Sequence, residues 1–137
     1  MERLRMLGRP LGLAIAAIRV ALGVVAYVAP DRVARPWVGE ADTPHQVAVL
    51  GRALGGRDLA LGLGALGSRR DPAALSRWVG LGALSDSGDT IATLISFRRL
   101  PAKGRWLVLA SSAGAALAGA VAIASRVASP SGEANAN

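Results

Sequence analysis

The sequence contains no cysteine, one histidine and one lysine, and aromatic residues make up only 4% of the chain. The absence of cysteine excludes a disulfide scaffold, and the lone His45 leaves no cluster of ligands with the spacing of a zinc site. The chain has no Walker A lysine motif, and the glycines near Gly62 lie inside an apolar stretch rather than after a strand. No Ser-His-Asp set is available. We therefore expect no catalytic residue, no metal and no cofactor.

Charged residues are also scarce, at 18% of the chain, against about 25% in a typical soluble domain. Hydrophobic residues reach 52%, which excludes disorder for most of the chain because disordered segments have low hydrophobicity. A length of 137 residues corresponds to one domain. The net charge is nevertheless +7, and a chain that is both this apolar and this basic indicates a membrane protein.

The basic residues are almost all arginine, since Lys103 is the only lysine among 16. They form short clusters between long apolar runs, without the interleaved aromatics of RNA-binding surfaces. This distribution is typical of charges that flank membrane spans. We therefore expect the lipid bilayer as a partner and no nucleic acid. The abundance of Arg, Ala and Gly also indicates a GC-rich, actinobacterial genome.

Four apolar segments are each long enough to cross a bilayer, which takes about 20 residues. They cover residues 11–29, 47–67, 76–97 and 106–125. Because short connections join them, the sequence predicts an all-α integral membrane four-helix bundle in up-down-up-down order. Residues 1–129 form this single four-span domain, and the polar tail 130–137 is expected to be disordered. A soluble four-helix bundle is the structural alternative.

Prolines and capping residues mark the ends of these segments. Thr43 and Asp71 each precede a proline, which is the pattern of an N-cap followed by proline at the first helical position. Pro101 precedes the fourth segment, and Pro30 is expected to end the first. Because Arg19 interrupts the first apolar run and ten more residues follow, we read it as a retained span and not as a cleaved signal peptide.

The aromatic residues lie near the span ends, where such rings anchor at the lipid headgroups. They are Tyr27, Trp37, Trp78, Phe97 and Trp106. Basic residues on the two sides of the four spans number seven against six, which gives no orientation. The flanks of the first span, with three arginines before it and two after it, favour cytoplasmic termini. Together with the four spans, this predicts a multi-pass protein of the cell membrane.

The charges inside the segments lie close to the middle of each span. We predict an intramembrane polar cluster of eight side chains: Arg19, Arg52, Arg57, Asp58, Asp86, Asp89, Thr90 and Thr93. Three arginines balance three aspartates in this set, although Arg52 lies about 7 Å from the midpoint of its span, where its side chain can extend toward the interface. Each charge without a partner would cost about 2.5–3.5 kcal/mol at a helix centre, so the second segment is not expected to insert stably alone.

The spacing predicts how these charges pair. Asp86 and Asp89 are three residues apart and share one helix face, with Thr90 and Thr93 close to it. Arg19 of the first segment and Arg57 of the second are the expected counter-ions, because guanidinium and carboxylate groups pair through two hydrogen bonds. The three charges of the second segment are spread around its axis and cannot all face one neighbouring helix. At least one must therefore meet a different helix, a cavity, water or another subunit.

Small residues also recur at spacings of four, as in Gly51/Gly55, Gly8/Gly12 and Ser111/Ala115/Gly119, which favours close helix packing. The last set, in the charge-free fourth segment, suits packing within the bundle or a homodimer face.

The chain resembles small four-helix membrane proteins of unknown function found in actinobacteria. The resemblance lies in Gly55-Gly56-Arg57-Asp58-Leu59-Ala60-Leu61-Gly62, in Asp86-x2-Asp89 and in Arg98-Arg99-Leu100-Pro101, and it covers about residues 11–125. An Arg-Asp dipeptide in the middle of a span is unusual. The resemblance implies the four-helix fold and the membrane location, and it implies no particular activity.

Three functions are compatible with this pattern. The first is a non-enzymatic multi-pass membrane protein, a structural or complex subunit held by the Arg/Asp network, with another copy or another membrane protein as partner. The second is a small transporter or permeation subunit that uses the cluster as a polar site, since ionisable residues within a membrane indicate function by default. The third is an intramembrane enzyme that uses Asp86 or Asp89 as acid or base on a lipidic substrate.

Overall fold

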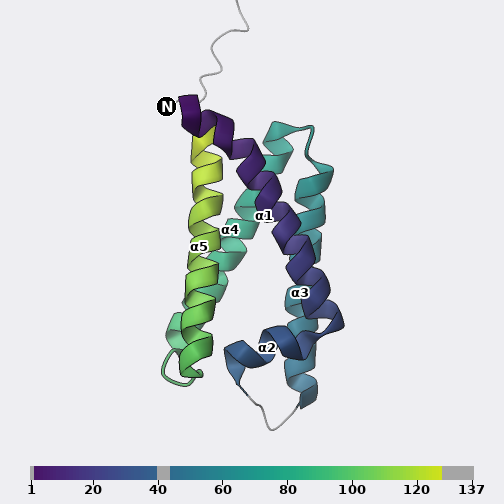
Figure 1. Ribbon diagram of the computed structural model, residues 1–137, viewed down its shortest axis with the longest axis vertical. Coiled ribbons are helices and arrows are strands. Elements are labelled where there is room, and N and C mark those ends of the chain that lie inside the picture. Colours follow the sequence, from purple (N-terminus) through teal and green to yellow (C-terminus); the bar gives the residue numbers. More distant parts are fainter. Residues whose placement is uncertain (1, 40–43, 128–137) are drawn as a thin grey trace, which may run out of the picture.

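The computed structural model describes residues 2–39 and 44–127, and within these ranges the chain forms five helices and no strand (Figure 1). The helices are α1 (Glu2–Val28), α2 (Pro30–Val38), α3 (Pro44–Gly67), α4 (Pro72–Ser96) and α5 (Ala102–Val127). The four long helices alternate in direction along the long axis, and α2 lies across one end of the bundle (Figure 1). The expected all-α class is confirmed.

The short helix α2 is a correction to the predicted four helices. The first helix ends just before Pro30, as predicted, but the chain turns at Ala29 and a new helix begins at Pro30 itself. Proline is well suited to this first position because its fixed φ matches a helix and its missing N–H needs no partner there. Asp31 in the first turn and Arg35 in the last complement the helix dipole. Gly39, with φ of 86°, ends the helix.

The long helices differ in how apolar they are. Only two stretches of the described chain, Gly8–Val28 and Ala102–Ala124, are long and apolar enough to cross a membrane by themselves. The segments 47–67 and 76–97 do not reach this level, because each carries several charges among its apolar residues. The coarse result is therefore an all-helical protein with two apolar helices that are candidates for membrane spans.

Two helix starts were predicted from capping residues. Asp71 caps α4: its Oδ1 accepts hydrogen bonds from the backbone N–H groups of Ala73 (2.9 Å) and Ala74 (3.0 Å), and proline follows directly. The N–H of Ala74 is the main reason that the pKa of Asp71 lies below its usual value. Thr43, the other predicted cap, and the tail 130–137 lie outside the described residues.

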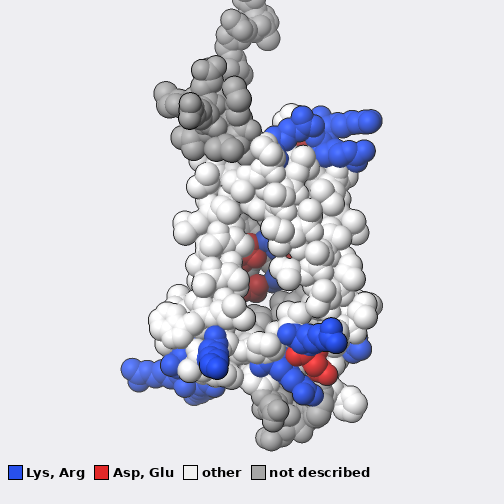
Figure 2. Space-filling model, viewed as in Figure 1, with Lys and Arg blue, Asp and Glu red and all other residues white. Residues whose placement is uncertain are grey.

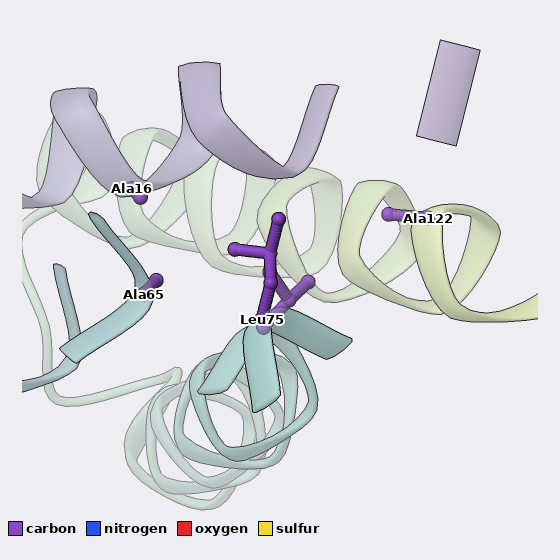
Figure 3. Packing of buried hydrophobic residues seen from close by; sticks show 5 residues of the cluster. Ala16, Ala65, Leu75 and Ala122 are labelled. Carbon is purple, nitrogen blue, oxygen red and sulfur yellow. The ribbon is translucent and has the colours of Figure 1, made fainter. Parts of the chain in front are cut away.

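The interior of the bundle is built from small residues. The central apolar cluster joins Ala16 of α1, Ala65 of α3, Leu75 and Val79 of α4, and Ala122 of α5 (Figure 3). Many large aliphatic side chains lie on the outside of all four long helices. Apart from Leu75 and Val79, the buried apolar cluster consists of alanines, whereas large apolar residues usually fill a core.

Glycines allow α1 and α3 to approach closely. A Cβ atom at Gly55 would lie 2.7 Å from the backbone nitrogen of Tyr27, and one at Gly23 would lie 2.9 Å from the carbonyl oxygen of Gly55. Gly119 of α5 is packed in the same way against Ala83 of α4, with 2.8 Å between the two Cβ positions. The Gly119 end of the predicted small-residue stripe therefore faces the bundle interior.

Candidate functional site

The predicted polar cluster lies at mid-height, where α1, α3 and α4 meet. Figure 2 shows a band with few charged residues between two charged ends of the molecule, and a hollow in this band exposes acidic and basic atoms. Antiparallel helices bring Arg19, Asp58 and Asp86 to the same height although they are far apart in sequence. The site is therefore a product of helix packing, with each helix contributing one or two charges.

Arg19 of α1 is the centre of the cluster. Its Nη1 donates to Oδ1 of Asp58 on α3 at 2.7 Å, and its Nη2 donates to Oδ2 of Asp86 on α4. The side chains of Arg19 and Asp86 are only 9% and 8% exposed. Gly82, one turn before Asp86, makes room for the guanidinium, because a Cβ there would lie 2.9 Å from Arg19 Nε. Arg19 thus ties three helices together by charge-assisted hydrogen bonds.

Arg57 of α3 forms the second part of the cluster. It binds Asp89 of α4 through two parallel hydrogen bonds, from Nη1 to Oδ1 at 3.0 Å and from Nη2 to Oδ2 at 2.9 Å. Its Nη2 also lies 3.4 Å from Oδ1 of Asp58, so this carboxylate is shared by both arginines. Arg57 Nε is buried and has no hydrogen-bond partner among the described residues. The pairing of Arg19 with Asp86 and of Arg57 with Asp89 matches the expected counter-ions.

Arg52 does not join this cluster. Its side chain is exposed, and no ion pair of Arg52 occurs within the described part of the chain. The expected balance of three arginines against three aspartates is therefore wrong: two guanidinium groups meet three carboxylates. The reason is helix geometry, because Arg52 lies five residues before Arg57 and points about 140° away from it around α3.

The two threonines of the predicted cluster connect α4 to the other helices. Thr90 Oγ1 donates to the carbonyl oxygen of Asp86 and lies 2.8 Å from Oγ of Ser112 on α5. Thr93 Oγ1 donates to the carbonyl oxygen of Asp89 and accepts a hydrogen bond from Nε1 of Trp37 at 3.2 Å. The polar cluster thereby reaches all five helices.

Sequence reasoning missed three residues of this site. Gly82 and Ser112 gave no signal, because glycine and serine are frequent in an apolar chain of this composition. The sequence predicts Trp37 as an anchor in the headgroup region, whereas its indole N–H donates a hydrogen bond to Thr93 of α4. The indole N–H of a partly buried tryptophan usually finds such a partner, but the sequence does not show which one.

Each carboxylate of the cluster forms an ion pair with at least one arginine. In the described ranges, no group of three or more His, Cys, Asp or Glu side chains has an arrangement that would hold a metal ion. The arrangement is suited to holding helices in one register, and its shared Asp58 couples the two arginine pairs. Comparison with protein-family models, with curated proteins and with solved structures finds no match to the chain. The resemblance to actinobacterial four-helix membrane proteins stays a prediction.

Proposed function

We propose that this protein is a multi-pass integral membrane protein of the cell membrane, in which α1, α3, α4 and α5 cross the bilayer. We further propose that it is non-enzymatic and serves as a structural subunit of a membrane complex, either with a second copy or with another membrane protein. The observation that carries the proposal is the paired Arg/Asp cluster at mid-height of a band with few charged residues.

The outer surface supports a lipid environment on all four long helices. Exposed large apolar residues include Leu22 on α1, Leu63 on α3, Leu84 on α4 and Leu117 on α5. A soluble monomer rarely exposes more than a few hundred Å² of continuous apolar surface. Small residues inside and large ones outside are what helix packing in a bilayer favours, because lipid solvates the large apolar side chains.

The helices α3 and α4 are long enough to span despite their charges. Their 24 and 25 residues correspond to about 36 Å at 1.5 Å per residue, against a hydrocarbon thickness of about 30 Å. Arg57, Asp58, Asp86 and Asp89 are paired within the bundle, so they do not meet lipid singly. We infer that α3 and α4 cross as part of the bundle and that α1 supplies Arg19 to make this possible.

Membrane insertion and orientation have a direct test, because the chain has no natural cysteine. Single cysteines at Ser68 in the α3–α4 turn and at Ala102, the first residue of α5, report opposite ends of the bundle. With cytoplasmic termini, a membrane-impermeant maleimide labels the Ala102→Cys variant in intact cells and labels Ser68→Cys only after permeabilisation. Equal labelling of both, or recovery of the protein in the soluble fraction, contradicts the four-span proposal.

The subunit role is tested separately in mild detergent. The chain, expressed at low level and solubilised from membranes, is expected to migrate as a particle of defined size above its 13.9 kDa monomer mass after correction for detergent. The Arg19→Met variant is expected to lose this particle, since Arg19 sets the register of three helices. A stable monomer as the sole species contradicts the subunit role.

A permeation subunit is the second candidate, and the hollow over the cluster favours it. The side chains of Arg57 and Asp89 retain 30% and 21% exposure, and one carboxylate is in excess over the guanidinium groups. The test is dissipation of a pH gradient in liposomes that contain the purified protein and an enclosed pH-sensitive dye. Flux that Asp89→Asn abolishes and Arg52→Met leaves intact favours this candidate, whereas absence of flux favours the structural role.

A further inference from the structure

A cleft of about 690 Å³ lies at the α4–α5 hairpin, away from the Arg/Asp cluster. Its volume falls in the range of small-molecule sites, roughly 300–1,000 Å³. Its walls combine apolar side chains of two long helices with two adjacent arginines of the turn. The lining residues are Leu94, Ile95, Phe97, Arg98, Arg99, Trp106 and Leu109.

The aromatic wall of this cleft is held by Arg105. The guanidinium of Arg105 lies over the ring of Phe97, 4.4 Å from its centroid, and donates to the carbonyl oxygen of the same residue at 3.1 Å. Phe97 in turn meets Trp106 edge to face, with 5.1 Å between ring centroids. These contacts hold the hairpin together. Because the guanidinium of Arg105 is engaged by Phe97, it is not free to bind a ligand.

Arg98 and Arg99 are different, because both are exposed and neither forms an ion pair within the described ranges. They lie in the turn just after α4, four residues beyond the strongly exposed Leu94 and Ile95. A cleft lined by apolar side chains and by two arginines matches the chemistry of a phospholipid, whose acyl chain is apolar and whose phosphate is anionic. Arg98 and Arg99 of two copies would repel each other, which disfavours a homodimer at this cleft.

We propose that this cleft binds one anionic glycerophospholipid of the surrounding bilayer, with an acyl chain along Leu94, Ile95 and Leu109 and the phosphate at Arg98 and Arg99. The proposal rests on the proposed membrane location. A bound lipid would anchor the α4–α5 hairpin at one membrane face. Anionic lipid attracts each nearby arginine, and the guanidinium fork is suited to phosphate oxygens.

The other end of the bundle offers a matched control. Arg69 and Arg70 also form an exposed arginine pair in a turn between two long helices, and they do not line the cleft. Neutralising either pair removes the same charge from one end of the molecule. Only the loss of Arg98 and Arg99 is expected to impair lipid binding, if the cleft and not general surface charge is responsible.

The experiment is native mass spectrometry of the full chain in a neutral detergent, titrated with dioleoyl phosphatidylglycerol or with dioleoyl phosphatidylcholine. We expect one phosphatidylglycerol to bind preferentially. The variant R98Q/R99Q should bind it about 30-fold more weakly, which corresponds to about 1 kcal/mol for each of two arginines. R69Q/R70Q should stay within about 3-fold of the original chain, which is about 0.7 kcal/mol. Ile95→Trp, which fills the cleft without changing charge, should also weaken binding.

Four outcomes would overturn the lipid site: equal binding of the two lipids, equal effects of the two arginine pairs, unchanged binding in Ile95→Trp, and full competition by inorganic phosphate. The last would show a simple anion site. Circular dichroism confirms that each variant is folded. Carbonate extraction of membranes tests the membrane location separately from the lipid site. If the protein resists extraction but shows no lipid preference, the membrane location stands and only the lipid site is overturned.

Discussion

Arg19 is expected to matter far more to stability than its partner Asp86, although the two form one ion pair. Arg19→Met leaves Asp86 buried without a cation and leaves Asp58 only its 3.4 Å contact with Arg57. One guanidinium then faces three carboxylates. Removing one partner of a buried pair costs about 3–5 kcal/mol, and we expect Arg19→Met to lower the free energy of unfolding by that amount.

Asp86→Asn has the opposite effect on the charge balance. Arg19 keeps Asp58 at 2.7 Å, and Arg57 keeps both hydrogen bonds to Asp89. Two guanidinium groups then face two carboxylates. The amide oxygen of asparagine still accepts a hydrogen bond, so the loss is the difference between a charged and a neutral one, about 1 kcal/mol. The two variants should differ by about 2–4 kcal/mol.

The assay is unfolding of the purified protein in lipid–detergent micelles by added SDS, followed by circular dichroism and by the fluorescence of the three tryptophans. Arg52→Met is the matched control, because Arg52 is exposed and lies outside the cluster, and its effect should stay within about 0.5 kcal/mol. The double variant R19M/D86L removes the pair together and should be more stable than R19M alone. If D86N costs as much as R19M, the excess-carboxylate reasoning is refuted.

Three further predictions concern single contacts. Arg57→Lys keeps the positive charge but loses the two parallel hydrogen bonds to Asp89. The free energy of unfolding should fall by about 1 kcal/mol in the same assay, a value reduced by the partial exposure of the pair. An unchanged free energy of unfolding would show that the two hydrogen bonds are not maintained. Gly55→Ala should destabilise the protein by about 1–3 kcal/mol because the added Cβ meets α1. Gly56 has open space around it, so Gly56→Ala should be neutral or stabilising by up to about 1 kcal/mol. Similar effects of the two variants would contradict the close approach of α1 and α3. Asp71→Ala should lower the thermal midpoint at neutral pH by removing the α4 cap. Because hydrogen bonding lowers the pKa of Asp71 in the folded state, the cap's stability is present above the unfolded pKa and is lost as pH falls through the folded one, so the original chain and the variant should converge in acid.

Much of the helical framework follows from local sequence. Long apolar runs broken by proline place α3, α4 and α5 to within about one turn of their observed bounds. The cap of α4 follows from Asp71 and the proline after it. The helix α2 was missed because a nine-residue segment with two prolines resembles a connection, and only its packing, with Ala34 buried and Trp37 bonded to Thr93, shows why it is helical.

The cluster shows the same division between local and tertiary information. The spacing of Asp86 and Asp89 places both on one face of α4, and the depth of Arg19 places it at the same height, so these pairings are predictable. The helical angles also require one charge of α3 to point elsewhere. The place of Arg57 at the midpoint of its span favours it as the partner of the Asp pair, but the sequence alone does not show that Arg52 stays outside the cluster.

The sequence by itself determined the helical class, the helix ends marked by proline and the height of each charge, since all three depend on neighbours along the chain. Only the tertiary structure decided that Asp58 is shared by Arg19 and Arg57 and that Arg52 is left outside. The physical reason is the rotation of α3 about its axis. That rotation is set where Gly23 and Gly55 let the backbones of α1 and α3 touch, a contact between residues far apart in the chain.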